Sequence, residues 1–113
     1  MNDDALTTCL LQRLAELYRE AGDAERSLAL LLLADRLAPA QTELRIALAA
    51  AFLASGQATR ALAALDPLVG QAADRPAVLR LSSQALWALG RRDEARQSLQ
   101  PWLTRIRQEA THA

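Results

Sequence analysis

Three glycines at a constant interval constrain this chain more than any other feature. Gly22, Gly56 and Gly90 are each 34 residues apart, and each precedes a short polar stretch that leads into a new apolar segment. Glycine ends a helix readily because it adopts the left-handed backbone conformation without a Cβ clash. A period of 34 residues is typical of helix–turn–helix units in a helical array. The spacing therefore predicts three such units in tandem.

The composition favours an all-α fold. Hydrophobic residues make up 51% of the 113 residues, and most of them are leucine and alanine, which are strong helix formers. No segment shows the alternating β-branched pattern of a strand. We therefore expect a single all-α domain over residues 1–113.

Apolar residues recur every three or four positions between glycines and prolines, which gives approximate helix bounds. The second helix carries leucines on nearly every side, so we expect it to be buried on more than one side. The six expected helices cover about residues 3–21, 24–37, 42–55, 59–69, 76–89 and 93–107, with a looser segment over 70–74 and a polar tail over 108–113.

Two prolines occupy the same repeat position inside expected helices. Pro67 and Pro101 are 34 residues apart, and an interior proline removes a backbone hydrogen bond and crowds the preceding turn. We expect kinks near Asp66 and Gln100, or helices that end there.

The repeats resemble tetratricopeptide repeats, in which small residues let two helices approach closely and large residues fill the space beside them. The first repeat reads Leu11, Leu14, Ala15, Tyr18, Gly22, Ser27, Leu31, Ala34, Pro39. The second reads Arg45, Leu48, Ala49, Phe52, Gly56, Ala61, Leu65, Leu68, Ala73. The third reads Leu79, Ser82, Ser83, Leu86, Gly90, Ala95, Leu99, Trp102. The resemblance implies a short right-handed solenoid of three repeats, at about residues 8–41, 42–75 and 76–109.

Catalysis, cofactor binding and metal binding find little support. His112, the single histidine, is next to the last residue, and Cys9 is the single cysteine. A rigid Ser–His or Cys–His pair and a cysteine-based metal site are therefore not expected. The chain has no glycine-rich phosphate loop. We expect a non-enzyme without cofactors.

The charge distribution gives no general reason to bind nucleic acid or an anionic membrane. The formal net charge is zero. It divides into a net −3 up to residue 70 and a net +3 from residue 71, which could orient a partner. The start of the chain is acidic where a secretory signal is basic, and no segment has the apolar length needed to cross a bilayer. A bacterial cytoplasmic location fits best.

Protein binding is the remaining function class. In tetratricopeptide arrays the first helices of successive repeats line a concave groove, and the resemblance places a polar part of it in the first repeat and an apolar part further on. Such a surface suits an amphipathic or extended peptide. Trp87 fits a position in the core as well as it fits the groove. Ile46 and Leu53 could be buried inside the monomer and not exposed in the groove. The nine expected groove residues are Gln12, Glu16, Arg19, Ile46, Ala50, Leu53, Arg80, Gln84 and Trp87.

The chain also resembles a narrower group, the small tetratricopeptide chaperones of bacterial type III secretion of the YscY (SctY) type. The resemblance rests on length, on the acidic start, on the leucine-rich second helix that ends at Pro39, and on the stretch from Ala85 to Arg96. It implies a heterodimer with a small secreted protein of the YscX type and contact with the export gate. A needle-subunit co-chaperone (YscG type) and a general interaction scaffold are the alternatives. Uncovered repeat ends further predict self-association when the chain is alone.

Overall fold

The computed structural model describes residues 3–39, 41–68 and 75–112. Within these ranges the secondary structure is helical, with no strand, which confirms the expected all-α class. The segment 70–74, expected to be a loose connection, lies outside the described residues. The elements are α1 (Asp3–Glu20), α2 (Ala24–Leu37), α3 (Thr42–Ala54), α4 (Ala58–Leu65), the 3₁₀ turn η1 (Asp66–Leu68), α5 (Pro76–Ala88) and α6 (Arg92–His112).

The three glycine turns share one geometry. Gly22, Gly56 and Gly90 have positive φ angles of 85°, 75° and 79°, so each uses the conformation that glycine adopts without strain. In each turn the residue after the glycine donates its backbone N–H to a carbonyl in the last turn of the preceding helix, which satisfies an otherwise unpaired group. These bonds are Asp23–Tyr18 (2.8 Å), Gln57–Phe52 (2.8 Å) and Arg91–Leu86 (2.9 Å).

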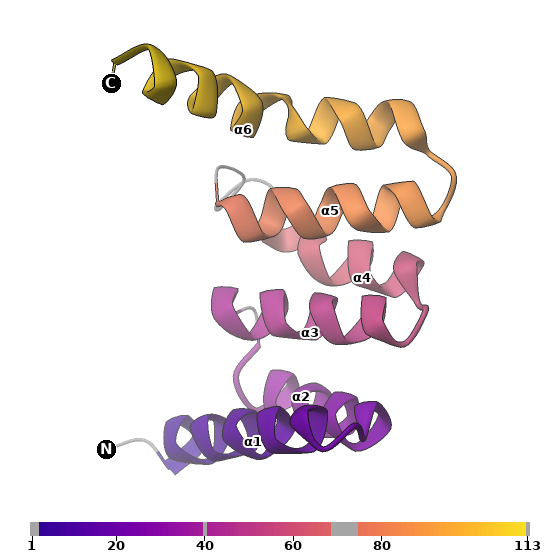
Figure 1. The fold of residues 1–113 in the computed structure, drawn as a ribbon. Coiled ribbons are helices and arrows are strands. Elements are labelled where there is room, and N and C mark those ends of the chain that lie inside the picture. Colours follow the sequence, from indigo (N-terminus) through magenta and orange to yellow (C-terminus); the bar gives the residue numbers. More distant parts are fainter. Residues whose placement is uncertain (1–2, 40, 69–74, 113) are drawn as a thin grey trace.

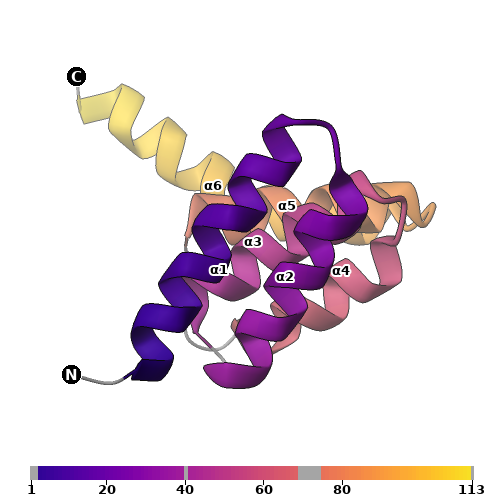
Figure 2. The ribbon, with the colours of Figure 1, turned by 90° about the horizontal axis from the view of Figure 1, so that it is seen from below.

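The helices form antiparallel pairs that stack on one another (Figure 1). Each helix packs against the next one along the chain, from α1 on α2 through to α5 on α6, and α3 also packs against α5. Seen from below, α1 and α2 lie side by side at the N-terminal end of the stack (Figure 2). The arrangement is an all-α solenoid, as the spacing predicts.

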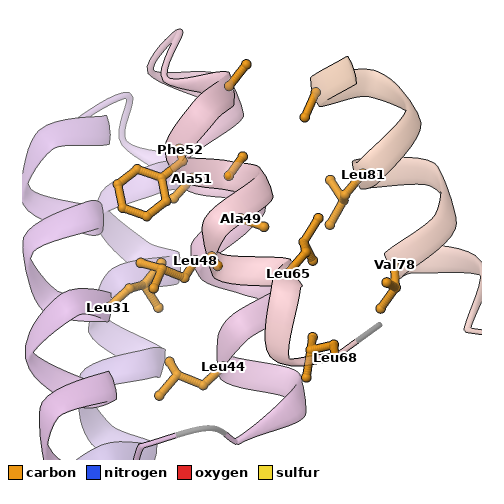
Figure 3. Packing of buried hydrophobic residues seen from close by; sticks show 14 of the residues in the cluster. Leu31, Leu44, Leu48, Ala49, Ala51, Phe52, Leu65, Leu68, Val78 and Leu81 are labelled. Carbon is orange, nitrogen blue, oxygen red and sulfur yellow. The ribbon is translucent and has the colours of Figure 1, made fainter. Parts of the chain in front are cut away.

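A single apolar core runs between the stacked pairs. Its largest fully buried side chains are Leu44, Leu65, Leu68 and Val78, which come from α3, α4, η1 and α5. Figure 3 shows these residues with Leu31, Leu48, Phe52 and Leu81 pointing into the space between neighbouring helices. The core is therefore shared between successive pairs, which makes each pair depend on its neighbours.

Small residues occupy the crossing points within each helix pair. Ala15 and Ser27 are buried where α1 crosses α2, and Ala49 and Ala61 are fully buried between α3 and α4. Short side chains at these positions let the backbones approach closely. This is the role that the repeat pattern predicts for them.

The two prolines at equivalent repeat positions lie in different local structures. Pro67 lies in η1, directly after α4 ends at Leu65, so the predicted helix end near Asp66 is confirmed. Pro101 lies inside α6, which stays helical from Arg92 to His112, so of the two alternatives expected near Gln100 the helix end is wrong and the kink stays a prediction. In both views the second half of α6 runs away from the rest of the molecule (Figures 1 and 2). Pro101 itself is exposed.

Two other expectations need correction. The polar stretch from residue 108 continues α6 to His112 and is not a tail beyond the helix. The second helix is not buried on several sides, because Leu32 and Leu33 are exposed while Ser27, Leu31 and Ala34 face the core. Within the described ranges no other helix covers these exposed leucines of α2.

Candidate functional site

The nine expected groove residues lie on α1, α3 and α5, three on each helix and at equivalent positions. These helices follow one another along the stack in Figure 1. Of the nine side chains, Glu16, Arg19, Ala50, Arg80, Gln84 and Trp87 are exposed, and Gln12, Ile46 and Leu53 are half-buried.

Four of the nine residues meet in one hollow of about 250 Å³ between α1 and α3. Gln12, Glu16 and Arg19 form its α1 wall, and Ala50 belongs to its α3 wall. The remaining lining comes from Ala15, Ser27, Leu31, Ala47, Ala51 and Ala54.

The alanines explain why the hollow exists. Four of the residues on its α3 side are alanine, so no side chain from α3 fills the space toward α1. The wall from α1 is polar and carries one acidic and one basic side chain, Glu16 and Arg19. Small-molecule sites usually measure about 300–1,000 Å³, so this hollow suits one or two side chains of a protein segment better than a cofactor.

Trp87 is on the surface. Its side chain is 53% exposed, so the alternative that placed it in the core is wrong. The guanidinium of Arg92, at the start of α6, lies over the indole ring at 4.9 Å from the ring centroid, within the range of a cation–π contact. An exposed Trp held by a neighbouring cation is the type of residue that dominates protein interfaces.

The side chains of Ile46 and Leu53 are partly buried. Both pack against the core but neither is fully buried, so the alternative that sealed them inside the monomer is wrong. Leu53 also lines a second hollow of about 330 Å³ beside the turns, together with Ala88, Leu89 and the residues from Gly56 to Arg60. These two side chains therefore support the groove from below while leaving part of their surface open.

Two ion pairs that the sequence did not indicate lie at the junctions between successive helix pairs. Arg45 Nε lies 3.1 Å from Asp35 Oδ1, with both side chains about four-fifths buried. Neither atom has a hydrogen-bond partner within the described part of the chain. Arg75 and Glu43 form a more exposed pair at 2.5 Å, between the residue before α5 and the first turn of α3.

Arg45 occupies the position at which the repeat pattern has a large residue in the first helix. The pattern therefore suggested that this side chain packs against its neighbours, and it gave no indication of an ion pair. The one feature of the sequence that could have suggested this ion pair is that two opposite charges, Asp35 and Arg45, stand on either side of a short connection between α2 and α3.

A further ion pair fixes the turn between α5 and α6. Arg91 donates two hydrogen bonds to Glu94, at 3.0 and 2.5 Å. These bonds, together with the opposite charge, lower the pKa of Glu94 and raise the pKa of Arg91. Both side chains are exposed, so the pair orients Arg91 and adds little to the free energy of unfolding. Arg92, the next residue, is then the cation that lies against Trp87.

The described residues contain no group of three or more His, Cys, Asp or Glu side chains placed to hold a metal ion. Within the same residues, no helix has both the length and the apolar character needed to cross a membrane. Cys9 is exposed on α1 and carries no disulfide.

Comparison with known protein families decides the classification. The model of the tetratricopeptide repeat family matches residues 52–113, which is more than half of the chain. The chain belongs to the tetratricopeptide repeat family. Searches of curated proteins and of solved structures returned no match. Tetratricopeptide repeats are typically non-catalytic scaffolds for protein–protein interaction, so membership of the family indicates a protein–protein interaction role for this chain.

Proposed function

We propose that this tetratricopeptide protein is a bacterial cytoplasmic chaperone of type III secretion. It holds one small secreted protein of the YscX (SctX) type as a heterodimer and helps that protein engage the export gate. The observation that carries the proposal is the alanine-lined hollow with a polar wall between α1 and α3. It offers one or two apolar side chains of a partner a place out of water, which is what an aggregation-prone segment requires of a chaperone.

The groove, defined by the nine residues on α1, α3 and α5, extends beyond this hollow. Glu16 and Arg19 supply charges of both signs on α1, and Arg80 and Trp87 supply a cation and an aromatic face on α5. A partner segment with apolar residues on one side and mixed charges on the other matches this order. An amphipathic helix or an extended strand of the partner is therefore the expected ligand.

Affinity capture from the source cell tests the proposal. The wild-type chain is compared with Ala50→Glu, which places a carboxylate in the hollow, and with Ala29→Glu as a matched control on α2. Both alanines are exposed helix positions, so both variants are expected to keep the helical circular dichroism spectrum. Ala29 is not among the residues that line the hollow.

The expected result is one small protein in equimolar amount with the wild type and with Ala29→Glu, but not with Ala50→Glu. Mass spectrometry of that protein, and its loss from the secreted fraction when Ala50→Glu replaces the wild type, test the secretion role. A needle subunit as the captured protein would favour the YscG-type alternative. Several unrelated proteins that all tolerate Ala50→Glu would contradict the chaperone proposal and favour a general scaffold.

A further inference from the structure

The two ends of the solenoid differ in polarity. Ten large apolar side chains are exposed among the described residues, and seven of them are leucines of α1 and α2. On α6, at the other end, Ile106 alone is in this group. A solenoid end is normally covered by a polar capping helix. The described surface of α6 has that character, whereas α1 and α2 do not.

Six of these leucines lie on the outer side of the pair formed by α1 and α2, whose two helices meet at one seam. Residues three, four and seven apart lie on the same side of a helix, so Leu6, Leu10 and Leu17 form one row, and Leu14 flanks it. The guanidinium of Arg26 on α2 lies 5.9 Å from the ring centroid of Tyr18 on α1, so these two side chains meet across the seam. Leu33 is seven residues after Arg26 and therefore lies on the same side of α2. We call this surface the leucine face: Leu6, Leu10, Leu14, Leu17, Leu33 and Leu37.

The leucine face is open and has the size of an interface. In Figure 2 it belongs to the helix pair nearest the viewer, and no other element covers that pair. The 18 residues of α1 span about 27 Å, and two adjacent helices are about 20 Å wide, so the face has a projected area on the order of 500 Å². A stable protein interface buries about 800 Å² of accessible surface on each partner, which this face approaches once its rim is included.

The chain itself supplies one suitable occupant. The exposed side chains of α6 are mostly polar or charged, so head-to-tail stacking would place leucines against polar groups. Among the residues that the structure describes, another leucine face is the large apolar surface that matches it. The rim carries both signs, with Arg13 and Glu20 on α1 and Glu25 and Arg36 on α2, and the net charge of the chain is zero. Two copies therefore meet without net repulsion.

We propose that the leucine face is the interface of a homodimer, with a second copy of this chain as its occupant. Packing the same face of both copies together closes the assembly at two chains. The groove stays open in the dimer because Gln12, Glu16 and Arg19 lie on a different side of α1 from Leu10 and Leu17, so each copy can still bind one secreted partner and the full complex then holds two such heterodimers. The interface does not depend on the proposed secretion role, since it involves none of the nine groove residues.

Light scattering after size exclusion tests this interface on the purified full chain. Leu10 and Leu17 are 61% and 60% exposed, so Leu10→Glu and Leu17→Glu are expected to fold. Each would place charges in an apolar contact and raise the dimer dissociation constant by more than about 100-fold. Ile106→Glu, an exposed site at the other end, and the groove variant Ala50→Glu are the matched controls, and both should stay dimeric.

The expected wild-type mass is that of two chains, independent of concentration well above the dissociation constant, and circular dichroism should be helical for all variants. A monomer at every concentration would overturn the proposal, as would a mass that grows beyond two chains. A dimer that survives Leu10→Glu and Leu17→Glu, or that Ile106→Glu disrupts equally, would also overturn it. Partner capture by the groove is measured separately, so the two proposals can fail independently.

Discussion

The side-chain hydroxyl of Ser27 donates a 2.8 Å hydrogen bond to the backbone carbonyl of Ala15. Both residues are buried at the crossing of α1 and α2, so the bond lies where the two backbones are closest. The third repeat has the reverse arrangement, because Ser83 on α5 donates to the carbonyl of Ala95 on α6 at 3.3 Å. Each crossing therefore needs a short side chain, and a serine there can also connect the two helices.

Enlarging this crossing should cost more than losing its hydrogen bond. We expect Ser27→Leu to lower the free energy of unfolding by about 1–3 kcal/mol, because the extra carbons force α1 and α2 apart. Ser27→Ala should cost about 1 kcal/mol or less, the net value of one hydrogen bond. Urea denaturation followed by circular dichroism measures both. Equal losses in the two variants would show that close approach is not what this position requires.

The glycine turns are expected to respond to backbone strain alone. Gly56 has φ = +75°, and a Cβ built there would have no atom within 4 Å. Gly56→Ala should therefore lower the free energy of unfolding by about 1–2 kcal/mol, the cost of a left-handed residue with a side chain. Gly56→Asn should cost less, since asparagine tolerates this conformation. The same urea titration measures the difference, and a larger loss for Asn than for Ala would contradict this explanation of the turn.

The Asp35–Arg45 pair connects the first helix pair to the second. Removing one partner leaves a largely buried charge without its counterion, so Asp35→Ala and Arg45→Ala should each lower the free energy of unfolding by about 1–3 kcal/mol. The double variant should cost less than the sum of the two, because it leaves no unpaired charge. A double-mutant cycle in urea measures the coupling. Additive losses would mean that the 3.1 Å contact contributes nothing to the repeat junction.

The two equivalent prolines provide a matched test of helix continuity. Pro101→Ala restores a backbone N–H in the interior of α6, so we expect it to raise the free energy of unfolding, by up to about 3 kcal/mol. Pro67→Ala should change it by less than about 1 kcal/mol, because Pro67 lies after α4 has ended. Thermal unfolding with helical content by circular dichroism compares them. Similar effects of the two substitutions would mean that the proline in α6 is under no strain.

The regular part of the fold was predictable from the sequence. The spacing of Gly22, Gly56 and Gly90 predicted the turns, because a helix end needs a residue that adopts positive φ, and the bounds of α2 followed from Gly22 and Pro39. Pro101 was predictable only as one of two outcomes. An interior proline either kinks a helix or ends it, and the sequence alone did not decide between them.

The candidate site was predictable in position but not in shape. The repeat register placed Gln12, Glu16, Arg19 and Ala50 on one surface, and the structure brings these four together. The hollow itself depends on which side chains are missing from α3, and this becomes visible only when helices are placed in space. The outer leucines of α2 were expected to be buried because leucine-rich helices usually have neighbours on both sides. Their exposure is a property of the end of the stack and not of the helix.

Site-specific photo-crosslinking in the source cell tests the central claim, that this chain binds its partner in the groove. A benzophenone amino acid replaces Ala50 in one variant and Ala29 in the other; both positions are exposed, and Ala50 alone is among the residues that line the hollow. We predict one dominant crosslinked partner protein from position 50 and no crosslink to that partner from position 29, where the expected neighbour is a second copy of this chain. The same crosslinked protein from position 29, with none from position 50, would contradict it.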